Sequence, residues 1–325
     1  MSNKRIYLAP MVGRTDEHYR VFIRLLSRNI YLYTEMITCD AYLNTDRKLY
    51  EVKPEEGYLT IQLAGSDSEK FSKCAEIIEK RGYSEINLNI GCPSNKVIRG
   101  QFGACLMSDP NKVAKFVKNI KQSCSLPVSI KTRLGLGYDT DLDLLKNLID
   151  KTAEAGCNKY FIHARNAILT GISPKKNRKV PLLRYSDAIK IKNLYPSLPI
   201  ILNGGIDKID VIKENINNFD GVMIGRRIYD YPLFLLEIES QIFGNNKSIS
   251  TQQIIKEYAK YAMLRSNEGI KSYLLLRHLF NLYYNTNLSK KWKKFLHETI
   301  YNHEDVSNIT YFEEMYYEKK ISTYG

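Results

Sequence analysis

A cysteine on a sharp turn is the residue of this 325-residue chain with the clearest potential for chemistry. Residues 86–90 (INLNI) alternate apolar and polar side chains, as a buried strand does, and lead directly into Gly91-Cys92-Pro93-Ser94. Glycine adopts backbone angles that other residues resist, and proline fixes the backbone, so this turn is stiff. Most free cysteines are simply small buried apolar residues. The neighbouring asparagines and the Gly-Pro bracket favour a reactive thiol here.

The elements that must position this thiol are short apolar runs, which alternate with amphipathic segments over about 240 residues. Strands are predicted at Ile6–Ala9, Tyr31–Met36, Tyr58–Ala64, Ile86–Ile90, Val128–Lys131, Tyr160–His163, Ile200–Asn203 and Gly221–Ile224. Helical periodicity is clearest at Ser68–Arg81, Pro110–Gln122, Asp141–Ala155, Tyr185–Leu194 and Asp207–Asn215. Eight such units predict an α/β fold, a (β/α)8 TIM barrel. Reactive groups of such barrels lie at the carboxyl ends of the strands, where Cys92 stands.

The last quarter of the chain has a different pattern. Residues 251–301 show helical periodicity alone, which predicts a small all-helical C-terminal domain joined by a Gly-Asn-Asn linker. The predicted domains are therefore 1–243 and 251–325. Lys and Arg greatly outnumber the two acids, Glu257 and Glu268, between positions 256 and 297, and Tyr and Trp292 lie among them. Such a composition is typical of RNA-binding segments, although a solvated helix face would also explain it.

Polar residues end most of the predicted strands, so they collect at one rim of the barrel. The strand ends supply Pro10 with Met11, Glu35, Gln62, Asn89 with Cys92, Lys131, His163 with Arg165, Asn203-Gly204-Gly205 and Gly225-Arg226. Buried polar groups are costly without partners, so the rim predicts a polar ligand. The last two glycine turns are where barrels bind phosphate. Lys131 and His163 suit the carbonyl and N1 region of a flavin ring, so FMN is the predicted cofactor.

The composition limits the class of protein further. The net charge of +13 favours a polyanionic partner, nucleic acid first and an anionic membrane surface second, although a biased genome could also raise the lysine content. Six cysteines without CxxC or metal-like spacing argue against a disulfide framework and a zinc site. No run of 18 apolar residues and no signal peptide is present, so we expect no membrane span and a cytoplasmic location.

Nine stretches together resemble the tRNA-dihydrouridine synthase family. They are LAPMVGRTD, YTEMIT, IQLAG, EINLNIGCPS, GACLM, SIKTRLG, HARNAILTGISPKKNR, LNGGI and GVMIGR. The segment ISPKKNRKVP resembles the DusA-like subgroup in particular. The resemblance covers residues 5 to about 245 closely and the helical tail less closely. It implies a TIM barrel with a helical tRNA-binding domain, and FMN-dependent reduction of the C5–C6 bond of D-loop uridines with NADPH. It suggests positions 20 and 20a and, as partner, the D-loop and elbow of tRNA.

Site residues follow from the same resemblance. Cys92 matches the catalytic cysteine, which would protonate C5 while reduced FMN delivers hydride to C6; a thiol suits this because it is mostly protonated at neutral pH. The implied FMN contacts are Pro10, Met11, Gln62, Lys131, His163, Asn203, Gly204, Gly205, Gly225 and Arg226. The implied uridine and tRNA contacts are Asn89, Arg165, Lys175, Lys176 and Arg178. We expect no metal, and a monomer.

The sequence departs from the subgroup at one point, and it leaves two alternative functions open. The chain has Gly13-Arg14 where the subgroup usually has an acidic-aromatic pair, so substrate position or loop order could differ near the pocket mouth. An FMN-barrel reductase of a small molecule would explain the barrel and leave the basic tail without a role. A catalytically silent RNA-binding barrel would leave Cys92, Lys131 and His163 without one.

Overall fold

All eight predicted strands are present in the computed structural model, which describes residues 5–45, 51–138, 141–246 and 249–315. Their bounds are β1 Ile6–Leu8, β2 Leu32–Thr38, β3 Leu59–Ala64, β4 Glu85–Ile90, β5 Val128–Arg133, β6 Lys159–His163, β7 Ile200–Asn203 and β8 Val222–Ile224. Neighbouring strands pair in parallel in the order β1-β8-β7-β6-β5-β4-β3-β2. The predicted strands agree with these bounds to within two residues.

The sheet closes into a barrel at Tyr31, just before β2. Tyr7 of β1 pairs in parallel with Tyr31, and the Tyr31 N–H donates to the Ile6 carbonyl at 2.9 Å. The Leu8 N–H donates back to the Tyr31 carbonyl at 2.9 Å. This contact joins the two edge strands, so the eight-stranded barrel predicted from the sequence is confirmed.

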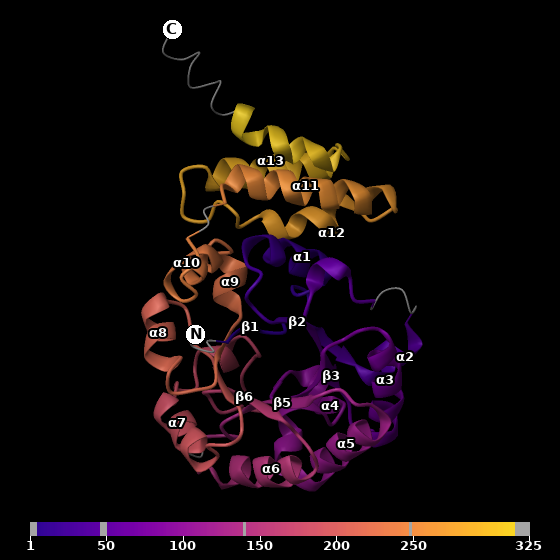
Figure 1. Cartoon of the computed structure of the whole chain (residues 1–325), viewed down its shortest axis with the longest axis vertical. Coiled ribbons are helices and arrows are strands. Elements are labelled where there is room, and N and C mark those ends of the chain that lie inside the picture. Colours follow the sequence, from indigo (N-terminus) through magenta and orange to yellow (C-terminus); the bar gives the residue numbers. More distant parts are fainter. Residues whose placement is uncertain (1–4, 46–50, 139–140, 247–248, 316–325) are drawn as a thin grey trace. The chain divides into compact units, whose positions relative to one another are not determined.

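Most of the helices that follow β2 to β7 lie around the outside of the strands (Figure 1). They are α2 Cys39–Asn44, α3 Ser68–Lys80, α5 Pro110–Ser123, α6 Asp143–Glu154, α7 Tyr185–Leu194 and α8 Ile209–Asn215; a further short helix, α4 Asn95–Arg99, follows β4. Asp67 caps α3 by accepting from the backbone N–H of Glu69 at 2.9 Å. Asp109 caps α5 by accepting from the N–H of Lys112, and Pro110 occupies its first turn. These helix starts are those that the local sequence predicts.

The barrel interior has an apolar side and a polar side. Tyr7, Tyr33, Phe161, Ile201 and Met223 form a buried cluster from β1, β2, β6, β7 and β8. The rings of Tyr7 and Phe161 meet edge to face with centroids 5.0 Å apart. Strands β3, β4 and β5 instead bury polar side chains: Gln62, Glu85, Asn87 and Ser129 are each at most 1% exposed.

The chain divides by packing into two compact units. The first comprises Met1–Gly13 and Ile30–Gly225 and contains the barrel; the second comprises Arg14–Asn29 and Arg226–Gly325. The elements of the second unit are α1 Glu17–Leu26, α9 Arg226–Asp230, α10 Phe234–Gln241, α11 Thr251–Asn267, α12 Ser272–Leu276, α13 Ser289–Tyr301 and 3-10 turns at Arg277–Leu279 and Val306–Tyr311. The assignment of residues 1–243 as a catalytic domain and of residues 251–325 as a tRNA-binding domain stays a prediction.

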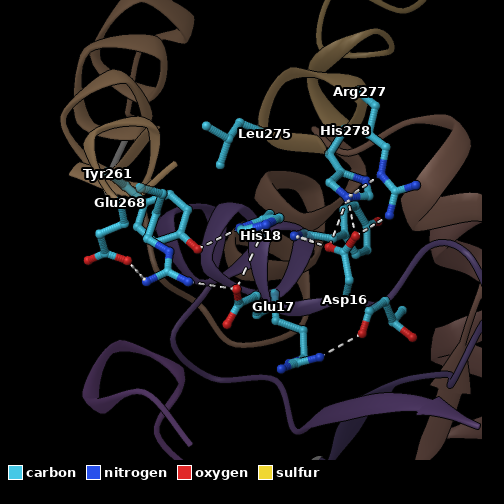
Figure 2. A network of polar contacts seen from close by, with 12 residues as sticks. Asp16, Glu17, His18, Tyr261, Glu268, Leu275, Arg277 and His278 are labelled. Atoms are coloured by element: carbon cyan, nitrogen blue, oxygen red, sulfur yellow. Dashed lines mark hydrogen bonds and ion pairs between the residues drawn. The ribbon is translucent and has the colours of Figure 1, made fainter. Parts of the chain in front are cut away.

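A network of ion pairs and hydrogen bonds holds the second unit together (Figure 2). Asp16 caps α1 by accepting from the Tyr19 N–H at 2.9 Å, and it also contacts Arg277 and, at 2.9 Å, His278. Glu17 pairs with Arg265 of α11 at 2.9 Å. Segment Arg14–Asn29 therefore belongs with the C-terminal helices, although more than 200 residues separate them.

A candidate active site at the carboxyl ends of the barrel strands

The turn after β4 holds Cys92 by its backbone. The Asn89 Oδ1 accepts hydrogen bonds from the N–H groups of Cys92, at 3.0 Å, and of Gly91, at 3.3 Å. The Cys92 thiol is half-buried and lies 3.6 Å from the Ser94 hydroxyl. A Cβ at Gly91 would lie 3.2 Å from the backbone of Thr132, so this close approach of two strands favours glycine. The thiol is therefore presented from a fixed backbone.

The GACLM motif supports the other side of this turn. Residues Gly103–Ser108 form a 3-10 helix, and the Ala104 N–H donates to the Cys92 carbonyl at 3.0 Å. Gly103 has a φ of +70°, and a Cβ there would lie 2.7 Å from the same carbonyl oxygen. Glycine is required at this position by conformation and by space. Both peptide groups of Cys92 are thus hydrogen-bonded.

Two predicted ligand-binding carboxamides meet beside the cysteine. The Asn89 Nδ2 donates to the Gln62 Oε1 at 2.8 Å. Gln62 is 1% exposed, whereas Asn89 is partly exposed at the end of its strand. Asn89 therefore joins the Cys92 turn to the barrel interior, in addition to its predicted contact with the base.

Lys131 lies across the rim, close to Asn203 of β7. Its Nζ donates to the Asn203 Oδ1 at 2.9 Å, and the Asn203 Nδ2 donates to the Met223 carbonyl at 2.7 Å. Burial, together with the nearby Arg133 guanidinium, lowers the pKa of Lys131 to about 7. Lys131 is also near enough to Cys92 to interact with it electrostatically. The predicted flavin contacts Lys131 and Asn203 are thus brought together, with Cys92 nearby.

Arg133 belongs to this site, although it is absent from the site residues predicted from the sequence. Its Nε donates to the Gly91 carbonyl at 3.2 Å, and its Nη1 donates to the carbonyls of Asn166 and Asn177 at 3.2 and 3.1 Å. Burial lowers the pKa of Arg133 to about 10, with Arg178 and Arg165 acting in the same direction and Cys92 opposing them. The signal was present in SIKTR, because residues two apart on a strand face the same side.

The predicted flavin contacts of the last three strands lie at close-packed glycine turns. Gly204 and Gly205 have φ values of +103° and +70°, and a Cβ at Gly204 would lie 3.0 Å from the His163 Nε2. A Cβ at Gly225 would lie 3.2 Å from the Ala9 Cβ and 3.5 Å from the Met11 Sδ. Pro10 and Met11 are half-buried directly after β1. A side chain in place of glycine would meet neighbouring protein atoms at both turns, so close packing favours glycine there.

The predicted RNA contacts lie on the loop after β6. Lys175, Lys176 and Arg178 are exposed around a 3-10 turn at Lys176–Arg178. Arg165 contacts the Pro181 carbonyl and donates to the Lys179 carbonyl at 3.3 Å. The Arg165 guanidinium therefore holds this basic loop, a role that the resemblance did not suggest. Its predicted contact with flavin or base stays a prediction.

Two predicted positions lie where the chain passes from one unit to the other. Arg226 begins α9 and belongs to the second unit, whereas Gly225 ends the first. Gly13 has a φ of +74°, and its N–H contacts the Glu35 carboxylate. Arg14 lies over the Tyr229 ring at 4.3 Å. The glycine at position 13 therefore suits the positive φ that the backbone adopts there.

The rim fits an anionic, ring-shaped cofactor such as FMN. Carboxamides of Gln62, Asn89 and Asn203 can donate and accept, and glycine turns follow β7 and β8. Lys131 is half-buried and Arg133 is buried, and the pKa values of both cations are lowered, so a negative charge nearby would stabilise both. Within the described ranges, no group of three His, Cys, Asp or Glu side chains could hold a metal ion. In the same part of the chain, no helix is long and apolar enough to cross a membrane.

Comparisons with known proteins identify one family. The family model described as dihydrouridine synthase (Dus) matches residues 7–316. The tRNA-dihydrouridine(20/20a) synthase of Shewanella oneidensis is 38% identical over 292 residues, which are 90% of this chain and 87% of that protein. The proteins of the same name from Synechocystis and Pseudomonas putida are each 38% identical, over 294 and 301 residues. These alignments cover 90% and 92% of this chain, and 88% and 90% of the two relatives.

Proposed function

Because the chain belongs to the dihydrouridine synthase family, we propose that it is an FMN-dependent tRNA-dihydrouridine(20/20a) synthase that uses NADPH. Its substrate would be uridine in the D-loop of tRNA, and the product would carry two further hydrogens at C5 and C6. The observation that carries this proposal is the Cys92 turn, with Asn89 bonded to its backbone and Lys131 and Arg133 close by. Relatives of the same name cover 90% of the chain at 38% identity.

The residues proposed to hold FMN are those of the rim. Lys131, His163, Asn203 and Gln62 would contact the ring, Pro10 and Met11 would line one side, and Gly204, Gly205, Gly225 and Arg226 would bind the phosphate. Bound FMN, reduced by NADPH, supplies the hydride that C6 of uracil receives. The positive charge of Lys131 would favour the reduced anionic ring.

Cys92 is the proposed general acid. Its thiol donates a proton to C5, so the uracil gains one hydride and one proton and the C5–C6 double bond becomes single. The fixed backbone on both sides of Cys92 keeps the thiol at one position relative to the ring face. Asn89 would hold the edge of the base, and Arg165 would contact the base or the flavin.

The proposed substrate has to leave its stack to reach this site. A uridine folded into tRNA has covered ring faces, so the base must be turned out into the rim. Lys175, Lys176 and Arg178 are exposed and cationic, and α13 carries Lys290, Lys291 and Lys294 on its exposed face. These two groups would bind the phosphates of the tRNA, with an affinity that falls as salt increases. We propose that a monomer performs the reaction.

A visible spectrum of the purified protein tests the proposal. We expect flavin bands that bleach with NADPH and recover anaerobically with unmodified tRNA, whereas free uridine does not restore them. Bands that bleach and ignore tRNA would indicate a reductase of a small molecule. A protein that shows no flavin bands even after incubation with FMN would be an RNA-binding barrel without this activity.

A further inference from the structure

A continuous line of hydrogen bonds crosses the polar side of the barrel and ends at the Cys92 turn. The Asn89 Nδ2 donates to the Gln62 Oε1 at 2.8 Å, and the Gln62 Nε2 donates to the Asn87 Oδ1 at 2.7 Å. The Asn87 Nδ2 then donates to the Ser129 Oγ at 2.8 Å, and the Ser129 hydroxyl donates to the Glu85 carboxylate. At the other end, the Asn89 Oδ1 accepts from the Cys92 N–H at 3.0 Å.

The carboxylate of Glu85 anchors this line at the opposite end of the barrel. Glu85 is 1% exposed at the first position of β4, and it pairs with the Lys159 Nζ at 2.5 Å. The Tyr58 hydroxyl also donates to it, at 3.1 Å. The anchor is thus a buried, charge-compensated acceptor at the start of the strand that carries Cys92.

Every hydrogen bond in the line runs in the same direction because its last member can only accept. An ionised carboxylate has no proton to donate, so Ser129 must donate its single proton to Glu85 and offer its lone pairs to Asn87. Asn87 must then present its NH2 to Ser129 and its oxygen to Gln62. The same argument turns the oxygen of Gln62 toward Asn89, and the oxygen of Asn89 toward the Cys92 N–H.

We propose that Glu85, Asn87 and Ser129 are positioning residues for Cys92: they fix the amide orientation of Asn89 and thereby the cysteine turn. The inference rests on the proposed function, in which Cys92 donates the proton. None of the three reaches the rim, since each is at most 1% exposed in the barrel interior. Aligned bonds of this kind also strengthen one another.

The first test measures the alkylation of Cys92 by iodoacetamide in the purified protein, quantified on the Cys92 peptide by mass spectrometry. Ser129→Ala removes the hydroxyl that joins Asn87 to Glu85. Of the two hydrogen bonds lost, the one from Asn87 is the link toward Cys92, and losing it should loosen the turn and change the rate by about 2- to 10-fold, the range for one neutral hydrogen bond. Ser27→Ala is the matched control, because Ser27 is also a buried serine that donates to a buried carboxylate, Glu239, in the other unit.

The second test compares the two half-reactions of the holoenzyme. Bleaching of the flavin by NADPH does not use Cys92, whereas recovery with tRNA does. We expect Ser129→Ala to slow recovery about 2- to 10-fold relative to bleaching, and Ser27→Ala to leave the ratio unchanged. A general loss of folded protein would lower the amplitudes of both steps and leave their relative rates as they are in wild type.

The outcomes separate this inference from the proposed function. Wild-type alkylation and wild-type half-reactions in folded Ser129→Ala would overturn the inference. A wild-type protein whose flavin ignores tRNA would overturn the proposed function, and Cys92 alkylation would still decide the positioning role. If Ser129→Ala does not fold, Ser129→Cys keeps the size of the side chain and replaces the hydroxyl by a weak donor and acceptor. The Cys92 alkylation rate should then change about twofold, and no change would overturn the inference.

Discussion

Cations in the two units of this chain have pKa values shifted in opposite directions. In the second unit, burial alone would lower the pKa of Arg277, but the hydrogen bond and charge of Asp16 outweigh it and raise that pKa. Glu17 does the same for Arg265. In the barrel, burial and Arg133 lower the pKa of Lys131 to about 7. Arg133 also has a lowered pKa, because burial and two like charges outweigh Cys92.

This contrast distinguishes a structural network from a binding site. The second unit pairs each of these cations with an acid, Arg277 with Asp16 and Arg265 with Glu17, and these pairs join the start of α1 to the C-terminal helices. The barrel rim brings cations together near a thiol, at a cost in stability that an anion would offset. We therefore expect changes at the rim to affect activity and spare folding, and changes at Asp16 to do the reverse.

The largest expected effect is on turnover. Cys92→Ala should lower the rate of tRNA reduction about 10²- to 10⁴-fold, the usual contribution of a general acid, because the proton donor is removed. FMN content, tRNA affinity and the melting temperature should stay close to wild type. Single-turnover recovery of the flavin with tRNA measures the rate of tRNA reduction, and calorimetry measures the melting temperature. Recovery at the wild-type rate would contradict the general-acid role.

Asp16→Ala tests the prediction that the network of the second unit contributes to folding stability. The variant removes the cap of α1 and leaves Arg277 and His278 without their shared acid. Since the Asp16 side chain is 17% exposed, we expect a loss of about 2–3 kcal/mol in the free energy of unfolding, less than for a fully buried pair. Urea unfolding followed by Trp292 fluorescence measures it. Asp210→Ala, which removes a first-turn acid of α8, is the control and should cost under about 0.5 kcal/mol.

The pH dependence of stability follows from the same aspartate. Burial would raise the pKa of Asp16, but His278, the Tyr19 N–H and Arg277 outweigh it and hold that pKa well below its ordinary range. A carboxyl with a lowered pKa stabilises the folded state above its unfolded pKa of about 3.9, and this contribution is lost as the pH falls. Wild type should therefore lose stability below about pH 4 more steeply than Asp16→Ala. Parallel curves for the two proteins would contradict the shift.

The fourth prediction concerns the affinity of the flavin-free protein for FMN. Lys131 has a pKa of about 7 there, so it is protonated below that pH and neutral above it. An anionic ligand binds the protonated form better, so affinity should fall as the pH rises from 6 to 9, by roughly tenfold. Lys131→Met should flatten this dependence, whereas Lys118→Met, at an exposed site on α5, should preserve it. Fluorescence titration of FMN measures both.

The smallest effect is expected on the surface of the second unit. Replacing Lys290 and Lys291 together by Ala should weaken tRNA binding severalfold and reduce the salt slope by about one for each phosphate that is no longer neutralised. The same change at Lys115 and Lys118 on the barrel helix α5 removes equal charge and should leave the slope unchanged. Equal effects of the two double variants would show that net charge, rather than this helix face, sets the affinity.

The elements of the barrel could be predicted because their signals are local. Alternation over residues 86–90 and the capping signals at Asp67 and Pro110 depend on neighbours within one turn or one strand. The predicted and observed bounds of the helix at Tyr185–Leu194 are identical. The strand ends also identified most of the rim, since parallel strands of a barrel bring their carboxyl ends to one face.

What only the tertiary structure decided depends on residues far apart in the sequence. The segment Arg14–Asn29 precedes the second strand of the barrel, yet it packs with helices more than 200 residues later because Asp16 and Glu17 find Arg277 and Arg265 there. Arg133 is recognised as part of the site through its bond to Gly91, and Glu85 as an anchor through Ser129 and Lys159. Sequence by itself determined which residue types stand at the strand ends. The direction of their hydrogen bonds and the sign of their pKa shifts follow from burial and partners, which exist once the barrel has closed.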